Sequence, residues 1–154
     1  MQNRHSLDSF ETESTQLARE WLVKIQTPID GVDPVIDALN EKISLKQGAY
    51  DKCLYITAPG YQRFHALEGS HAGLEDTMQN TSAVEITFSI PPNSEILDKV
   101  FDTVFAVHCN EEPTIHIQEI WGSRSKYIDD KDNPNRYWNR ADAEKIHGSS
   151  TALD

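Results

Sequence analysis

Alternation of apolar and polar side chains along the chain predicts a set of β-strands. The clearest case is 83–90, where Val84, Ile86, Phe88 and Ile90 point one way and polar residues point the other. A period of two over this length is typical of a strand with one buried face. The segments expected to be strands are 21–27, 50–57, 83–90 and 114–121.

A four-residue spacing of apolar side chains predicts an amphipathic helix between the first two strands. Asp33 can cap its free amides, and Pro34 suits the first helical position. Gly48 is expected to end the helix in a left-handed conformation. The helix would cover the sheet with a stripe built around Val35 and Leu39.

A second helix is expected between the last two strands. It follows Pro91-Pro92, with Asn93 or Ser94 as its cap, and continues to about Val107. The side chains expected to form its buried stripe are Leu97, Val100, Phe101, Val104 and Phe105.

The resulting order, β-α-β-β-α-β, predicts an α+β chain with the ferredoxin-like arrangement, a four-stranded antiparallel sheet with two helices on one face. We expect this domain to occupy 16–121, after a flexible leader over 1–15. Beyond it, 122–154 lacks regular apolar spacing and is expected to be a polar extension, partly draped on the surface.

The net charge of the chain limits which classes of partner are expected. The 154 residues include 14 basic and 25 acidic side chains, a net charge of −11. Nucleic acids and anionic membranes are recognised with clustered Lys and Arg, so neither is an expected partner. No apolar run approaches the ~20 residues that cross a bilayer, and 1–14 lacks the apolar core of a signal peptide. We therefore expect a cytoplasmic protein in which Cys53 and Cys109 are free thiols.

Several short motifs occur in an order that resembles a known domain. They are Gly48-Ala-Tyr-Asp-Lys-Cys53, Gly60-Tyr-Gln-Arg-Phe64, Leu67-Glu-Gly-Ser70 with Gly73, and His108-Cys-Asn-Glu-Glu-Pro113. Together they resemble the insert domain of the Nif-three-like family, also called GTP cyclohydrolase type-two homologues, over about 21–121. The resemblance implies a CutA-like or PII-like domain that forms a homotrimer. Cys109-Asn110 departs from the Pro-Tyr usual in that turn, and the flanking halves that carry the family's dinuclear metal ligands have no counterpart here.

The turn between the second helix and the last strand has the residue types of a divalent-cation site. His108, Glu111 and Glu112 offer imidazole and carboxylate ligands, to be completed by a neighbouring subunit. The alternative is structural: the His108 imidazolium would interact with the helix C-terminus while the glutamates bind backbone amides.

The long connection over 60–82 is the second candidate. The resemblance to PII-like proteins implies that this connection contacts ligands and partners. Arg63, His65 and His71 lie among three glycines, so the segment suits a small anionic ligand. The spacing matches no phosphate-loop motif, and a long hairpin needs glycines for its turns in any case.

A cluster of aromatic and basic residues marks the C-terminal extension. Arg136, Tyr137 and Trp138 are residue types that dominate protein interfaces, so they are candidates for contacting a protein partner or for packing on a neighbouring surface. For nucleophilic catalysis the one local pair is Cys109 beside His108, and adjacent side chains usually point apart. No catalytic residue is assigned.

The sequence thus favours a non-catalytic trimeric domain that binds a small ligand, a metal ion or a protein at clefts between subunits. The alternative is a metal-dependent hydrolase or cyclohydrolase that uses His108, Glu111, Glu112 and Cys53 across an interface. A divalent metal ion is the one cofactor to be considered.

Overall fold

The computed structural model describes residues 6–126, 131, 133–134 and 136–148. The chain divides into two compact units. One is formed by 19–122, and the other joins the described residues before 19 with those after 122.

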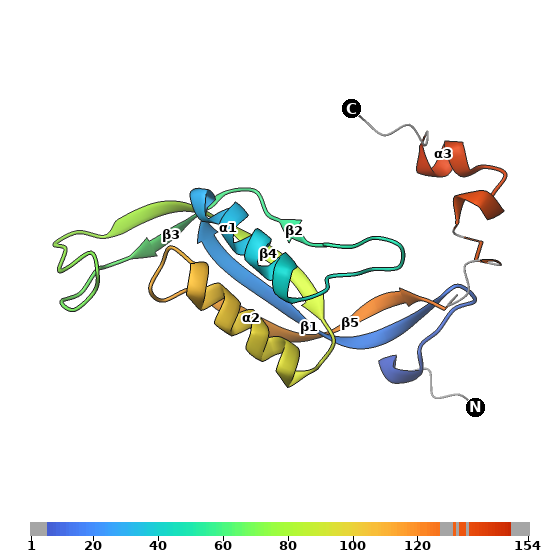
Figure 1. Ribbon diagram of the computed structural model, residues 1–154, viewed down its shortest axis with the longest axis horizontal. Helices are drawn as coiled ribbons and strands as arrows, with labels where there is room; N and C mark the ends of the chain where they lie inside the picture. The colour runs from blue at the N-terminus through green and yellow to red at the C-terminus, as the bar shows by residue number, and fades with distance from the viewer. Residues whose placement is uncertain (1–5, 127–130, 132, 135, 149–154) are drawn as a thin grey trace. The chain divides into compact units, whose positions relative to one another are not determined.

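The 19–122 unit has the predicted ferredoxin-like order of elements (Figure 1). The elements, with the ends of β1 and β5 extending beyond the unit, are β1 (Thr15–Pro28), η2 (Ile29–Gly31), α1 (Val32–Lys42), β2 (Tyr55–Ile56), β3 (Gly60–Phe64), β4 (Gln79–Ile90), α2 (Ser94–Val107) and β5 (Ile115–Ser125). The strand order is β2-β4-β1-β5, and β3 also pairs with β4. The second and last strands therefore lie at opposite edges, as expected.

The sheet has five strands, and the prediction of four was wrong. The edge strand expected over 50–57 is reduced to β2, and β3 follows it along the same side of β4. Pro59 lies between the two segments and lacks the amide that a continuous ladder needs, which explains the break. The connection expected over 60–82 consequently begins with β3 and ends with the first residues of β4, leaving 65–78 as the hairpin loop.

The core lies between α1, α2 and one face of the sheet. The strand residues of the core come from the antiparallel pair of β1 and β4, with Val23 opposite Phe88 and Ile25 opposite Ile86. The buried residues of this cluster are Val23, Ile25, Val35, Leu39, Leu45, Ile86, Phe88, Ile90, Val100 and Val104. Alternate positions on each strand supply it, so both helices cover the same face (Figure 1).

Three details of the helices differ from the prediction. α1 begins at Val32, after the 3-10 turn η2, so Asp33 is inside the helix and makes no cap bond. α1 ends at Lys42, and Gly48, with φ 56°, lies in a later turn. The Asn93 side chain caps α2 as expected, by accepting hydrogen bonds from the Glu95 and Ile96 amides. Phe105, which was expected to be buried, is 54% exposed, because the sheet receives a narrower stripe around Val100 and Val104.

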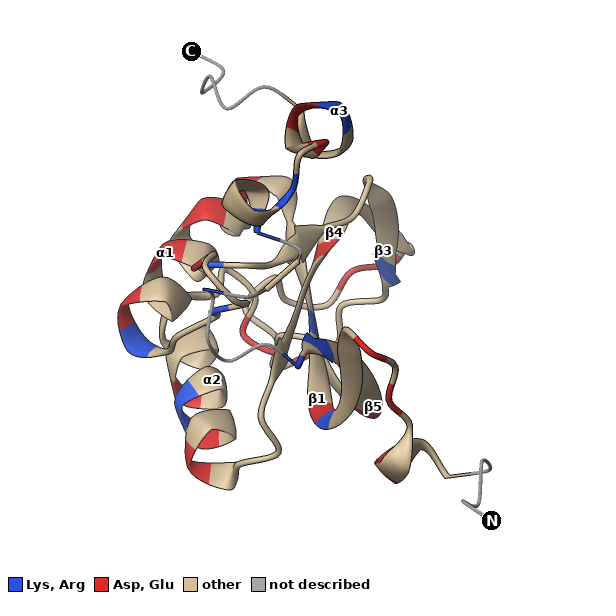
Figure 2. Cartoon of the chain, turned by 90° about the vertical axis from the view of Figure 1, so that its right-hand side faces the viewer, with Lys and Arg blue, Asp and Glu red and all other residues tan. Residues whose placement is uncertain are grey.

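The two sides of the sheet differ in charge. α1 and α2 carry six exposed carboxylates and two lysines, so the helical side is acidic (Figure 2). We call the opposite side of the sheet the outer face. It presents mixed, half-buried or exposed side chains: Leu22, Lys24, Gln26, Glu85, Thr87, Ser89, His116 and Gln118. Neither α1 nor α2 covers it.

The second unit is a ribbon followed by short helical turns. Lys126 donates its backbone amide to the Ser14 carbonyl (3.1 Å) and forms an ion pair with Glu11 (3.4 Å). Its short helical elements are η1 (Leu7–Ser9), η4 (Tyr137–Asn139) and α3 (Ala143–His147). Among the described residues, no helix has the length and apolar character that crossing a bilayer requires.

Candidate functional site

His108 fastens the turn between α2 and β5, residues 108–113, which we call the His108 turn. Its ring Nδ1 accepts a hydrogen bond from the Asn110 amide (2.9 Å). A ring nitrogen that accepts carries no proton, so Nε2 is the protonated nitrogen and donates to the Gln26 carbonyl on β1 (2.8 Å). Both ring nitrogens therefore have hydrogen-bond partners within the chain.

The carboxylates of the His108 turn do not converge with this ring. Glu111 Oε1 accepts a hydrogen bond from the backbone amide of His71 in the hairpin loop (2.6 Å), and Glu112 is exposed. Among the described residues, no three His, Cys, Asp or Glu side chains are grouped so that they can hold a metal ion. A metal at this turn therefore needs a rearrangement of His108 or ligands from another chain.

The hairpin loop holds its shape through internal hydrogen bonds. The His65 ring bonds the Glu75 carbonyl, and Ser70 Oγ donates to the Leu67 carbonyl (2.7 Å). Gly69 (φ 95°) and Gly73 (φ 75°) adopt the left-handed backbone that the tight turns require. The loop thus reaches the His108 turn through the backbone of His71, not through its imidazole.

Arg63 lies apart from these contacts, on β3 in register with Asn80. Its side chain is exposed, and its guanidinium has no hydrogen-bond or ion-pair partner in the described part of the chain. Of the three residues predicted to bind an anion, Arg63 has an unpaired guanidinium within the described residues, whereas His65 and His71 make hydrogen bonds that hold the loop.

The two cysteines are separate thiols. Cys109 is exposed, with Sγ 3.9 Å from Asn110 Oδ1, while the His108 ring bonds other groups. The His108 ring is therefore not placed as a base for Cys109. Cys53 is half-buried, and its Sγ lies 3.7 Å from the Asp51 carbonyl.

In the second unit, the aromatic and basic side chains of 136–138 contact one another. The rings of Tyr137 and Trp138 meet edge to face, with centroids 5.1 Å apart, and the Arg136 guanidinium lies 5.6 Å from the Trp138 ring. Both rings remain more than half exposed, which leaves them accessible to a partner. Nearby, two hydrogen bonds from Arg140 lower the pKa of the Asp142 carboxyl.

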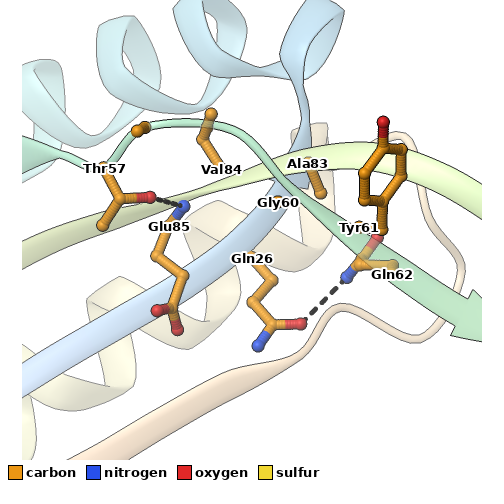
Figure 3. Close-up of a pocket in the computed structure, with 9 residues that line it drawn as sticks. Gln26, Thr57, Gly60, Tyr61, Gln62, Ala83, Val84 and Glu85 are labelled. Atoms are coloured by element: carbon orange, nitrogen blue, oxygen red, sulfur yellow. Dashed lines mark hydrogen bonds between the residues drawn. The ribbon is translucent and has the colours of Figure 1, made fainter.

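A hollow at the edge of the sheet formed by β2 and β3, beside β4, was not predicted. It has a volume of about 320 Å³. Its lining is Gln26, Thr57, Ala58, Gly60, Tyr61, Gln62, Ala83, Val84 and Glu85 (Figure 3). We call it the edge hollow. Its polar residues come from three distant segments. In sequence alone, Gln26, Thr57 and Glu85 are ordinary polar strand positions, and Tyr61 and Gln62 belong to the predicted connection over 60–82.

Comparison of the coordinates with solved structures finds this architecture elsewhere. A Bacillus cereus protein related to NIF3 superposes with a TM-score of 0.55 at 20% sequence identity, over 79% of this chain. The two chains share a fold. That agrees with the resemblance inferred from the motifs, since the match covers most of the described domain. No protein-family model and no curated protein matches the sequence.

The extent of the match limits what it implies. This chain corresponds to 31% of the length of the NIF3-related protein, so the activity of the whole of that protein is a separate matter. The periplasmic divalent cation tolerance protein CutA from Archaeoglobus fulgidus superposes with a TM-score of 0.47 at 22% identity, over 66% of this chain and 83% of that one. CutA1 from Ehrlichia chaffeensis gives 0.49 at 16% identity, over 73% and 86%.

Proposed function

We propose that this chain is a non-catalytic binding domain that assembles as a homotrimer through its outer face and sheet edges. The observation that supports it is the placement of α1 and α2 on one side, which leaves the outer face without a helical layer. A sheet with free edges offers unpaired backbone groups that a symmetric neighbour can satisfy, and the uncovered face leaves room for that neighbour to pack. The acidic helical side would repel a second copy.

The edge formed by β2 and β3 supports the same assembly. Tyr55, Tyr61 and Phe64 are exposed along it, at 69%, 79% and 45%. Large aromatic side chains are enriched in protein interfaces, because they bury much apolar area at small entropic cost. A threefold arrangement is the one that the Nif-three-like and PII-like resemblance implies.

Light scattering coupled to size-exclusion chromatography tests the assembly. We expect a particle of three times the chain mass of 17.5 kDa. Ser89→Arg places a charge on the outer face and should yield monomers, whereas Ala106→Arg, on the exposed side of α2, should leave the trimer intact. A wild-type monomer at micromolar concentration would show that the proposal is wrong.

We further propose that the trimer binds a small anionic ligand, a metal ion or a protein segment where the hairpin loop and the His108 turn meet a neighbouring subunit. The Glu111–His71 hydrogen bond supports this place, because it brings the two segments together, and the open charge of Arg63 supports an anion.

Thermal unfolding in the presence of inorganic phosphate tests the anion. Stabilisation should be lost in Arg63→Gln and kept in Lys99→Gln, which removes an exposed charge from α2. Equal stabilisation of both variants would reject Arg63 as the anion ligand. Elemental analysis should be run on the same samples, because both a metal ion as the ligand and the hydrolase alternative require stoichiometric divalent metal.

A further inference from the structure

The edge hollow arises from a β-bulge in the edge strand. Ile56 pairs with Ile86, and Gly60 pairs with Ala83. Between these pairs the edge strand has three residues, 57–59, where β4 has two, 84 and 85. An extra residue bends the strand and re-aims its side chains, which is why bulges are frequent beside binding sites.

Hydrogen bonds hold the bulge in a defined shape. Thr57 donates its amide to the Glu85 carbonyl (3.0 Å), and Thr57 Oγ1 accepts from the Glu85 amide (2.9 Å). Both backbone groups of Glu85 that face the edge strand, its amide and its carbonyl, therefore bond to Thr57. On the neighbouring strands, Gln62 Nε2 donates to Gln26 Oε1 (3.1 Å), which holds the two side-chain amides together. Figure 3 shows Thr57, Glu85 and Gln26 pointing to the same side of the sheet.

The hollow has a single formal charge, and it is negative. Of the nine lining residues only Glu85 is ionic. Its carboxylate is half-buried and, within the described residues, has neither a hydrogen-bond nor an ion-pair partner. Because Gln26 Oε1 is occupied by Gln62, the oxygens left to accept bonds include the Glu85 carboxylate and Gln62 Oε1. These groups suit a ligand that donates several hydrogen bonds and carries positive charge.

We propose that the edge hollow binds a small organic cation through a primary ammonium or guanidinium group. Glu85 would supply the counter-charge, with Gln62 Oε1 as a further acceptor. Ala58 and Ala83 provide apolar wall for a short methylene chain, whereas Val84 lies on the opposite side of β4 from Glu85. The volume lies at the low end of the ~300–1,000 Å³ range of small-molecule sites, so the ligand is small.

The same groups do not favour a metal ion. Calcium binds ~6–8 oxygen ligands and magnesium needs a near-octahedral set. The hollow has one carboxylate, and no metal-holding group of three His, Cys, Asp or Glu is present among the described residues. An ammonium or guanidinium group needs fewer acceptors and tolerates looser geometry, so it fits this lining better. The inference goes beyond the proposed assembly, because it assigns a ligand to groups of a single chain. The hollow shares Gln26 and Glu85 with the outer face, and Tyr61 with the edge proposed for assembly.

Isothermal titration calorimetry on the full chain at low ionic strength tests this inference. The probes are agmatine, as a free diffusible cation, and Nα-acetyl-lysine-N-methylamide, as a lysine side chain of another protein. Butyramide serves as a neutral control. We expect saturable binding of at least one cationic probe, weakened by added salt, and none of butyramide. Which cation binds more tightly identifies the source of the ligand.

A pair of variants locates the site. Glu85→Gln keeps the size of the side chain and should weaken cation binding at least tenfold. Glu119→Gln removes an exposed carboxylate from β5, outside the hollow, and should bind as the wild type does. Glu85→Asp, which keeps the charge, should retain part of the affinity. Circular dichroism of each variant confirms that it is folded.

Three results would overturn the inference: no saturable cation binding by the wild type, equal binding by Glu85→Gln, or equal binding of butyramide. Light scattering on the same samples separates this failure from that of the proposed assembly. A monomer that binds the cation leaves the edge hollow assigned, whereas a chain that still binds no cation after dilution to the monomer rejects the edge hollow alone.

Discussion

Two adjacent residues of α2 should respond to truncation in the reverse order of their size. Val104 is fully buried between the helices and the sheet, while the larger Phe105 is 54% exposed. Val104→Ala removes two buried carbons, worth ~0.8 kcal/mol each, and leaves a cavity that adds ~1 kcal/mol. Alanine returns ~0.5 kcal/mol of helix propensity. The expected loss in the free energy of unfolding is therefore ~2 kcal/mol.

Phe105→Ala should cost much less. About half of the side chain is already in water, so the lost transfer free energy is ~1 kcal/mol. Water fills the vacated space, so no cavity is added. The better helix propensity of alanine offsets ~0.5 kcal/mol. Urea unfolding followed by circular dichroism measures both. With a slope of ~1–3 kcal/mol per M, Val104→Ala should lower the midpoint by ~1 M and Phe105→Ala by a few tenths.

A greater loss for Phe105→Ala than for Val104→Ala at all protein concentrations would refute this placement of α2. A loss at Phe105 that appears only at high concentration would instead show that a second copy covers the ring. Measurement at two protein concentrations separates these cases.

Further expectations concern the helix cap, a close approach and the loop contact. Asn93→Ala removes the acceptor for two first-turn amides and should cost ~1 kcal/mol by urea unfolding; an unchanged midpoint would reject the cap. Gly31→Ala would place a Cβ 2.4 Å from Thr27 Oγ1, a fully buried residue, and should cost ~1–3 kcal/mol, less in a Thr27→Ala background; equal cost in both backgrounds would contradict the clash. Glu111→Ala should increase amide hydrogen exchange in the hairpin loop, whereas Glu112→Ala should not.

What the sequence could predict follows from how local each signal is. The alternation in 83–90 and the cap at Asn93 depend on neighbouring residues, and the structure has both. β3 has no such signal, because an edge strand beyond the helices is exposed on both faces and its pairing depends on β4. Phe105 misled the prediction because a helical stripe can be wider than the sheet surface that receives it.

The candidate sites show the same limit. His108 was identified from its residue type, but its role depends on the Gln26 carbonyl, 82 positions away in the chain. The edge hollow depends on three segments and a bulge that no single segment encodes. Residue type and spacing therefore predict candidate ligands, whereas the register of the sheet decides which of them meet.

The two proposals constrain each other at Glu85. If the outer face is the trimer interface, assembly removes water from this carboxylate, and an unpaired charge in such a place costs several kcal/mol. The wild type should then assemble more tightly when agmatine is present, because the bound cation offsets the buried charge. Glu85→Gln should assemble tightly without agmatine and gain nothing from it. Sedimentation velocity across a dilution series measures both effects, and an assembly of the wild type that is independent of agmatine would mean that the interface leaves Glu85 in contact with water.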